Sequence, residues 1–556
     1  MQIDDCCKLL YNVTQLIIRT MKQFKLTFTL LVCLLAILAS NTSNAQPTRK
    51  APLPKDKVAM QYAETITSAD LSKHLELLAG KEFMGRGNGQ EGLTKAAKYI
   101  ADNFEQYGLT PMGDKKSYFQ NVPLLIVDKM NPTIAIGNTK YEFLKDYYCF
   151  NRSTSNMGDK VDEVLFLGYG IDDATYSNYK NVDVKGKTIV VLQGEPMLPD
   201  STYLLTKNKT ASVWTTDWRK KTEVAKLKGV KNMLVITTDI AAKVTQYKSY
   251  ILGEGMMQLA ADVNNTNPTE KIVNTFYISS DIAKQLLGKQ YKKLIDAAQK
   301  GKAKSKKIST NLSLQVKKDA KELNVANILG YIEGTDLKDE VIILTAHYDH
   351  LGFEHNEVYY GADDDGSGTV ALIEMAQAFA QAKAEGNGPR RSILIMPVAG
   401  EEKGLLGSRY YTDIAPVFPL KNTVADLNTD MIGRIDDQHE NGDYIYIIGD
   451  DKLSSELRRI NEAMNLRYSQ IDLDYRYNDE NDPNRFYYRS DHYNFAKNDI
   501  PVIFYFNGTH PDYHKPSDTV DKIDFGAMEK RARLIFHTAW ELANREDRIP
   551  VDSHKK

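Results

Sequence analysis

Histidines and carboxylates stand at five separate points in the second half of the chain, each near the end of an apolar segment. They are His347-Tyr-Asp349-His350, Asp363-Asp364-Asp365, Glu401-Glu402, Asp430, and Asp512-Tyr-His514-Lys-Pro-Ser-Asp518. Imidazole and carboxylate groups, with no thiolate among them, are ligands that suit zinc or another borderline divalent cation. The residue types therefore indicate a metal site, and the number of oxygen donors favours two ions over one.

Each of these groups also has an ordinary structural explanation. A histidine after a strand is commonly a core or loop residue, a Glu-Glu pair is commonly solvated, and adjacent Asp residues commonly cap a helix. Three adjacent carboxylates, however, repel one another unless a cation lies among them. Because all five groups are expected at one edge of one sheet, we favour the metal site.

The chain around these groups alternates between short apolar strands and amphipathic helices. Strands are predicted over residues 341–346, 392–398, 423–430, 444–448 and 501–506, and helices over 369–382, 453–464 and 525–545. This alternation predicts an α/β fold with a mostly parallel central sheet and helices on both faces. In such sheets ligands bind beyond the carboxyl ends of the strands, which is where the five groups stand.

The first half of the chain has a different texture. Residues 68–107 predict two helices joined by a Gly-rich loop, and residues 131–309 predict short strands with a helix between two of them. The lysine-rich run 300–307 indicates a solvated linker at a domain boundary. We therefore expect residues 46–130 and 310–556 to form one domain, into which a smaller β/α domain of residues 131–309 is inserted.

The composition excludes several classes of protein. The 556 residues carry a net charge of −2, from 71 Lys+Arg and 73 Asp+Glu, and 42% of them are hydrophobic. A balance this close to neutral argues against a nucleic-acid binder. No apolar run reaches the roughly 20 residues that a membrane-spanning helix needs.

The N-terminus predicts export. The apolar stretch 26–39 follows Lys22 and Lys25 and precedes Ser-Asn-Ala-Gln at 43–46, as in a secretory signal peptide cleaved after Ala45. Met21 would be an ordinary start for such a peptide, so the first 20 residues are extra. We expect residues 1–45 to be removed and the protein to be secreted or periplasmic, with no stable membrane insertion. Cys149 is then the one cysteine of the mature chain, and we expect it to be a small core residue.

The sequence resembles the zinc-dependent exopeptidases of peptidase family M28, in the secreted form that carries a protease-associated (PA) domain insert. Besides the five metal motifs, the resemblance covers Leu77-Leu-Ala-Gly-Lys-Glu-Phe-Met-Gly-Arg-Gly, Tyr107-Gly-Leu-Thr-Pro-Met-Gly-Asp, Ser117-Tyr-Phe-Gln and the PA-like stretch 161–195. It implies a zinc-exopeptidase (phosphorylase/hydrolase-like) fold with two zinc ions, other divalent ions being alternatives.

The resemblance also implies a role for each site residue. One ion would be bound by His347 and Asp430, the other by Glu402 and His514, and Asp364 would bridge them. Asp349 would orient His347, and Glu401 would be the general base that takes a proton from a water held between the ions. His350 and Asp518 are expected to be structural, and Ser490-Asp491-His492 to be a helix N-cap rather than a catalytic triad.

The expected function is an aminopeptidase acting on peptide or protein substrates, with the acidic stretch 479–482 near the substrate amine. A glutamate-type carboxypeptidase is an alternative, since Arg485 and Arg489 could hold a carboxylate. A single-metal glutaminyl cyclase is another, against which the five intact ligands argue. A non-catalytic receptor-like module is a fourth, against which the intact Glu401 argues.

Overall fold

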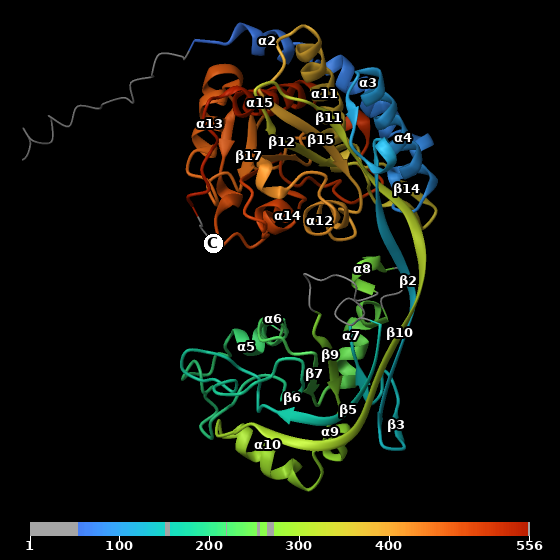
Figure 1. Cartoon of the computed structure of the whole chain (residues 1–556), viewed down its shortest axis with the longest axis vertical. Helices are drawn as coiled ribbons and strands as arrows, with labels where there is room; N and C mark the ends of the chain where they lie inside the picture. Colours follow the sequence, from blue (N-terminus) through green and yellow to red (C-terminus); the bar gives the residue numbers. More distant parts are fainter. Residues whose placement is uncertain (1–53, 151–155, 218, 253–255, 264–271, 554–556) are drawn as a thin grey trace, which may run out of the picture. The chain divides into compact units, whose positions relative to one another are not determined.

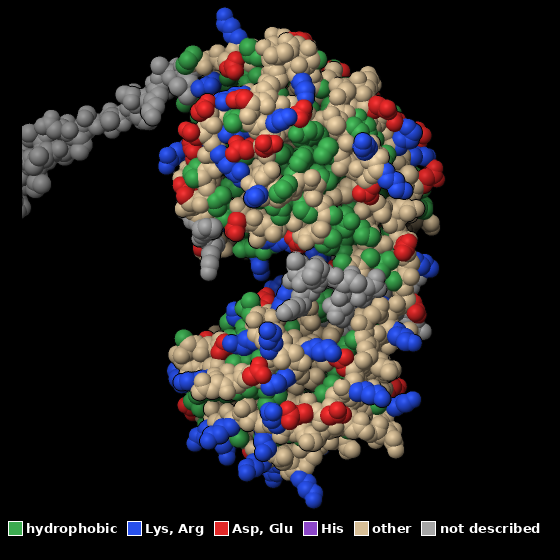
Figure 2. Space-filling view, viewed as in Figure 1, with side chains coloured by type: hydrophobic (Ala, Val, Ile, Leu, Met, Phe, Trp, Pro, Cys, Tyr) green, Lys and Arg blue, Asp and Glu red, His purple; other side chains and the backbone are tan. Residues whose placement is uncertain are grey.

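The computed structural model describes residues 54–150, 156–217, 219–252, 256–263 and 272–553. The signal peptide predicted over residues 1–45 lies outside these residues, as does Met21. Within the described ranges, none of the helices has both the length and the apolar character needed to cross a bilayer. Basic and acidic side chains are interspersed over the face shown in Figure 2, as the near-zero net charge leads one to expect.

The central sheet has eight strands in the order β1-β11-β15-β12-β16-β19-β17-β18 (Figure 1). Its four inner strands are parallel: β15 (Arg391–Val398), β12 (Leu337–His347), β16 (Thr423–Thr429) and β19 (Val502–Phe506). Antiparallel neighbours flank them: β11 (Gly330–Ile332) and β17 (Tyr444–Ile448), followed at the edges by β1 (Thr110–Pro111) and β18 (Asp472–Asp474). The predicted mostly parallel α/β sheet is thus confirmed.

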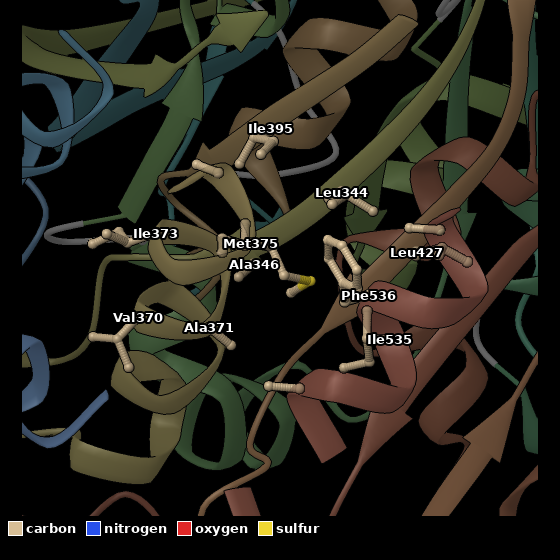
Figure 3. Packing of buried hydrophobic residues seen from close by; sticks show 14 of the residues in the cluster. Leu344, Ala346, Val370, Ala371, Ile373, Met375, Ile395, Leu427, Ile535 and Phe536 are labelled. Carbon is tan, nitrogen blue, oxygen red and sulfur yellow. The ribbon is translucent and has the colours of Figure 1, made fainter. Parts of the chain in front are cut away.

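Alternate residues of each strand serve the two faces of this sheet, as the period of two requires. On β12, Ile342, Leu344 and Ala346 pack with α11 (Gly368–Ala384) and α15 (Phe525–Asn544) (Figure 3). Val341 and Ile343 instead join a cluster with Tyr411 of α12 (Leu406–Asp413) and Phe495 of α14 (His492–Ala496). Helices on both faces hold the strand ends rigidly, which is what a precise site needs.

The remaining helices of this layer lie on the α11 and α15 side. They are α2 (Lys57–Ala63), α3 (Ser68–Leu78), α4 (Glu91–Gln106) and α13 (Leu457–Met464). The chain enters α3 through Thr67, whose side chain accepts a hydrogen bond from the Asp70 amide and donates one to its carboxylate. Between α3 and α4 runs a tight segment (η1, Lys81–Arg86), so two helices joined by a loop are confirmed for residues 68–107.

A second sheet has nine strands, and its two longest extend to the first hydrophobic core. β2 (Phe119–Ile136) and β10 (Lys306–Ile328) pair antiparallel along almost their whole length. Near one end, Leu124 and Val325 belong to the core of the central sheet, whereas Ile134 and Leu314 belong to a separate core. The predicted limits at 130 and 309 both fall inside these strands, and the domain ranges stay a prediction.

The rest of this sheet contains four parallel strands: β5 (Met157–Phe166), β6 (Thr188–Leu192), β7 (Asn232–Ile236) and β9 (Asn274–Ile278). Shorter strands are β3 (Thr139–Tyr141), β4 (Tyr147–Tyr148) and β8 (Met256–Leu259). One face is covered by α9 (Ser280–Leu287) and α10 (Tyr291–Gln299), and the other by α6 (Lys220–Leu227) and α7 (Ile240–Leu252). Cys149 is buried in the first of these two cores.

Candidate metal centre

The first group of ligand-type side chains meets at the carboxyl edge of the inner strands. His347 ends β12, Asp430 directly follows β16, and Asp364 lies in the turn that precedes α11 (η5, Ala362–Ser367). His347 Nε2 lies 3.3 Å from Asp364 Oδ1 and 3.5 Å from Asp430 Oδ1, and all three residues are buried. The structure therefore brings together the three side chains expected around one ion.

The second group shares Asp364 through its other oxygen. His514 Nε2 lies 3.1 Å from Asp364 Oδ2 and 3.3 Å from Glu402 Oε2. His350, which we expected to be structural, also reaches this point: its Nδ1 lies 2.8 Å from Glu402 Oε1 and 3.7 Å from Asp364 Oδ2. Asp364 thus faces both groups, as a bridging carboxylate would.

Spacing shows which of these atoms fit an ion. Ligands held at 2.0–2.2 Å in a tetrahedron lie roughly 3.4 Å from one another. The distances around His347 and around His514 match this edge, whereas the 2.8 Å between His350 and Glu402 is shorter. His350, Asp364 and Glu402 also form a group that could hold an ion, and we take His514 as the candidate ligand because its distances match this edge.

Unsatisfied polar atoms around the second group indicate that a ligand binds there. Among the described residues, the buried side-chain atoms without a hydrogen bond include both ring nitrogens of His350, Asp364 Oδ2 and Glu402 Oε1. Buried polar atoms are nearly always satisfied, so an orphaned cluster of donors and acceptors calls for a ligand. The residues present fit divalent cations of the zinc type.

Glu401 and Glu402 diverge after the end of β15. Glu402 reaches the second group, while Glu401 Oε2 stays 4.0 Å from His347 Nε2 at the mouth of the cleft. The turn depends on Gly400 and Gly404, with φ of +78° and +109°, a region that side-chain-bearing residues rarely adopt. Glu401 is thus close to the first group without being one of its expected ligands.

Asp349 does not contact His347 as expected. Its carboxylate is 3.9 Å from His347 Nδ1, and that nitrogen lies instead 3.0 Å from the backbone carbonyl of Asp349. The carboxylate accepts hydrogen bonds from the Asn88 side chain at 2.6 Å and from the Glu401 amide at 3.2 Å. Asp349 therefore fixes the backbone that carries Glu401, and its main chain orients the histidine.

The three adjacent aspartates, residues 363–365, make different contacts. Asp365 accepts hydrogen bonds from the amides of His347, Gly368 and Met431, and Asp363 accepts one from the Gly433 amide. Asp518 accepts bonds from the amides of Asp363 and Asp364, which agrees with its expected structural role. Only the middle carboxylate is left to face an ion, so the outer two lock the loops around it.

Arg86, from the Gly-rich segment before α4, is fully buried behind these loops. Its guanidinium donates to four backbone carbonyls: Leu78 (2.7 Å), Tyr348 (2.8 Å), Tyr360 (2.9 Å) and Gly361 (2.7 Å). Tyr348 lies between His347 and Asp349. One side chain therefore joins the end of α3 to the two loops that carry His347 and Asp364 of the first group.

Ser490 and Asp491 precede α14, but neither caps it with its side chain. Ser490 donates to Asp430 Oδ2 at 2.6 Å and accepts from the Asn428 amide group at 2.8 Å. Asp491 accepts a hydrogen bond from Ser408. Asp491 thus occupies the expected N-cap position, but its side chain contacts a buried partner instead of capping the helix, and Ser490 orients a candidate ligand.

The electrostatic field of the site is strongly negative. Burial lowers the pKa of His347, but Asp430 and Glu401 outweigh it and raise this pKa well above its ordinary value. Burial likewise lowers the pKa of His514, and hydrogen bonds with Asp364 and Glu402 raise it to about 10. Burial, with Glu402 and Asp430, raises the pKa of Glu401. Such a field attracts cations and favours a proton-accepting role for Glu401.

Comparison with known proteins identifies this part of the chain. Residues 327–539 match the sequence profile of peptidase family M28, and they contain every candidate ligand and Glu401. We call the matched residues 327–539 the M28 domain.

Curated relatives of the M28 domain include two named aminopeptidases. Aminopeptidase YwaD of Bacillus subtilis is 25% identical over 227 residues, which are 40% of this chain and 45% of that protein. A probable leucine aminopeptidase of Arthroderma benhamiae is 30% identical over 215 residues, 37% of this chain and 55% of that protein. The chain thus spans about half the length of each. A solved aminopeptidase from Aneurinibacillus sp. strain AM-1 has a TM-score of 0.44 and 17% identity, over 89% of this chain and 99% of that one.

The cleft of the M28 domain has a mixed wall around the metal centre. Apolar side chains, a single arginine and two hydroxyl groups line it together with the candidate ligands: Met431, Phe486, Phe504, Phe506, Arg489, Thr509 and Tyr513. Arg489 packs on the Phe486 ring, 4.8 Å from its centroid, and donates to the Tyr513 hydroxyl at 3.3 Å. The acidic stretch 479–482, which we expected near a substrate amine, lines a separate cavity instead.

Proposed function

We propose that the protein is a dinuclear zinc exopeptidase, most specifically an aminopeptidase. The observation that carries the proposal is the two ligand groups on opposite oxygens of Asp364, with Glu401 Oε2 4.0 Å from His347 of the first group. Peptidase family M28 and the aminopeptidase names of the relatives support the reaction class. When bound, two ions would polarise the scissile carbonyl and lower the pKa of a water molecule.

The side chains of the cleft would transfer the proton, stabilise the transition state and bind the substrate side chain. Glu401 takes the proton of the attacking water and returns it to the leaving amine, a task that suits a carboxylate with a raised pKa. Tyr513 and Arg489 present donors to the oxygen that becomes negative in the transition state. Met431, Phe504 and Phe506 form an apolar surface for the side chain next to the cleaved bond.

Arg489 favours one alternative, a carboxypeptidase that holds the terminal carboxylate of its substrate. Peptides with a free or acetylated amino terminus, each as a carboxylic acid or an amide, separate the two activities. We expect acetylation to suppress kcat/KM by 100-fold or more, on the order of the 2.7 kcal/mol that losing a charged contact costs. Loss of turnover on amidation alone, with full turnover of acetylated peptides, would establish the carboxypeptidase.

We expect purified protein to bind two zinc ions per chain. Each of the two ligand groups can hold one ion. Because both groups include the carboxylate of Asp364, two cations would compensate the negative charges of these buried carboxylates. Metal analysis after exhaustive buffer exchange measures the ratio. A reproducible ratio of one, with no gain in activity on adding zinc, would contradict the dinuclear site and favour the cyclase.

We further propose that residues 1–45 are a cleaved export signal and that the mature enzyme works outside the cytoplasm. The Lys-led apolar stretch and the Ala45 cleavage pattern support this. Residues 131–309 would be a PA-like insert. N-terminal sequencing of the mature protein should begin at Gln46.

A further inference from the structure

A second cavity, of about 350 Å³, lies in the M28 domain beside the turn that borders the metal cleft. Its walls include three tyrosines, an arginine, an acidic turn and one lysine: Tyr477, Tyr487, Tyr488, Arg485, Asp482 and Lys452. Neither the ligand groups nor Glu401 lines it. The chemistry of the cleft therefore leaves this cavity without a role.

Lys452 is the unusual member of this wall. It is only 5% exposed, and its Nζ points at the ring of Tyr487, 5.0 Å from the centroid. Across the part of the chain that the structure describes, no carboxylate lies within ion-pair distance of this ammonium and no side chain or carbonyl accepts a hydrogen bond from it. The side chain is buried along its length, and its ammonium, which has no carboxylate partner among the described residues, lies in the cavity wall, where an anionic group of a ligand can pair with it.

The acidic residues of the cavity do not supply that group. Asp482 accepts hydrogen bonds from the amides of Asn484 and Phe486, and Asp479 accepts one from the Asn481 amide. The carboxylates of Asp482 and Asp479 hold the turn together. With Glu480, which also lines the cavity, they would repel a multiply charged anion. Arg485 adds a second cation, stacked on the Tyr488 ring at 4.8 Å. The cavity therefore suits a single carboxylate rather than a phosphate.

The cavity is within reach of a substrate in the metal cleft. One short turn (η9, Phe486–Tyr488) serves both, since Phe486 lines the cleft and Tyr487 and Tyr488 line the cavity. On the sheet, Ile448 pairs with Phe504 of the cleft wall, and Lys452 follows four residues later. The chain from Ile448 to Lys452 spans at most roughly 14 Å. An extended substrate peptide covers the same distance with about four residues.

We propose that this cavity is a subsite for a carboxylate of the peptide substrate, three or four residues beyond the cleaved bond, with Lys452 as its partner. The inference rests on the proposed aminopeptidase. Such a subsite makes the enzyme prefer short peptides, whose terminal carboxylate lies at that distance from the cleaved bond. It also favours longer peptides that carry an acidic side chain at that position.

The test compares matched substrates. Leu-Ala-Ala-Ala as the free acid should be cleaved with a kcat/KM about tenfold above that of its amide, the size expected for one charge-assisted contact. In Lys452→Met the ratio should fall to about one, and in Lys452→Arg it should be retained. Lys98→Met is the matched control, because Lys98 pairs with Asp102 on the surface of α4 and should leave the ratio at ten. Peptide amides with Glu or Gln at the third position after the cleaved bond distinguish a side-chain carboxylate from a terminal one.

Other outcomes are equally decisive. Leucine 4-nitroanilide has no amino-acid residue and no carboxylate beyond the cleaved bond, so its hydrolysis reports the aminopeptidase alone. If the wild type cleaves it but treats acid and amide peptides alike, or if Lys452→Met keeps the tenfold ratio, the subsite is overturned while the aminopeptidase stands. Calorimetric binding of acetyl-Leu-Ala-Ala-Ala acid and amide to the wild-type protein needs neither a variant nor turnover, and equal affinities would overturn the subsite too.

Discussion

Glu401→Gln should lower kcat by at least about a hundredfold while both zinc ions remain bound. The substitution keeps the shape of the side chain but removes the group that accepts a proton, and general-base catalysis contributes roughly 10² to 10⁴-fold in rate. Glu401 lies outside both ligand groups, with its Oε2 4.0 Å from His347 Nε2. The amide of Glu401 still donates to Asp349, so the loop keeps its anchor. Single-turnover kinetics and metal analysis on the same preparation measure the two quantities.

Glu402→Gln is the matched control, because it makes the same chemical change one residue away. Glu402 contacts His514 and Asp364 in the second group, so its loss should first weaken one of the two ions. Added zinc should then restore part of its activity, and it should restore none to Glu401→Gln. Substantial turnover by Glu401→Gln, or loss of zinc from it, would mean that the two roles have been exchanged.

The pH dependence of activity should also reflect the protonation of Glu401. Burial and neighbouring carboxylates raise the pKa of Glu401, so the base becomes protonated, and activity falls, at a higher pH than for an exposed glutamate. Activity is present above this pKa and is lost as the pH falls through it. Bound cations act in the opposite direction and set the final position of the limb.

The strand ends and their ligands could be predicted because each signal is local in the sequence. An apolar run that ends in His347 or Asp430 indicates both a strand and the side chain at its carboxyl end. Parallel strands bring these ends together at one edge of the sheet. The positions of β12, β15, β17 and α15 followed from the same periodicity. For these elements local pattern and final fold agree, as minimal frustration requires.

Contacts between distant segments carried no such signal. Arg86 donates to carbonyls as many as 275 residues away, and backbone carbonyls are the same in every sequence. The hydrogen bond from Asn88 to Asp349, and the one from Ser490 to Asp430, likewise join side chains with no recognisable spacing. The position of His350 beside Glu402 had no local signal for a related reason, since it depends on how two loops fold back.

Arg86→Met should both destabilise the protein and weaken zinc binding. Methionine fills part of the buried space but donates nothing, so four carbonyls lose their hydrogen bonds, each costing about 1 to 3 kcal/mol when left unsatisfied. Two of these carbonyls belong to Tyr348 and Gly361, in the loops that carry His347, Asp349 and Asp364. We expect zinc affinity to fall by about 10 to 100-fold, as when other supports of ligand residues are removed.

Arg391→Met separates positioning from general stability. Arg391 is as deeply buried and also donates to carbonyls, those of Leu542 and Arg545, but it stands at the start of β15, at the opposite end of the strand from Glu401. Both variants should unfold at lower temperature, yet only Arg86→Met should lose zinc affinity when titrated at a temperature where it is folded. Arg86→Lys keeps the charge and at most three donors, so it should recover affinity in part. Wild-type zinc affinity in folded Arg86→Met would show that Arg86 is not needed to position the ligands. The hydrogen bonds of Asp363, Asp365 and Asp518 would then be sufficient to hold the loops.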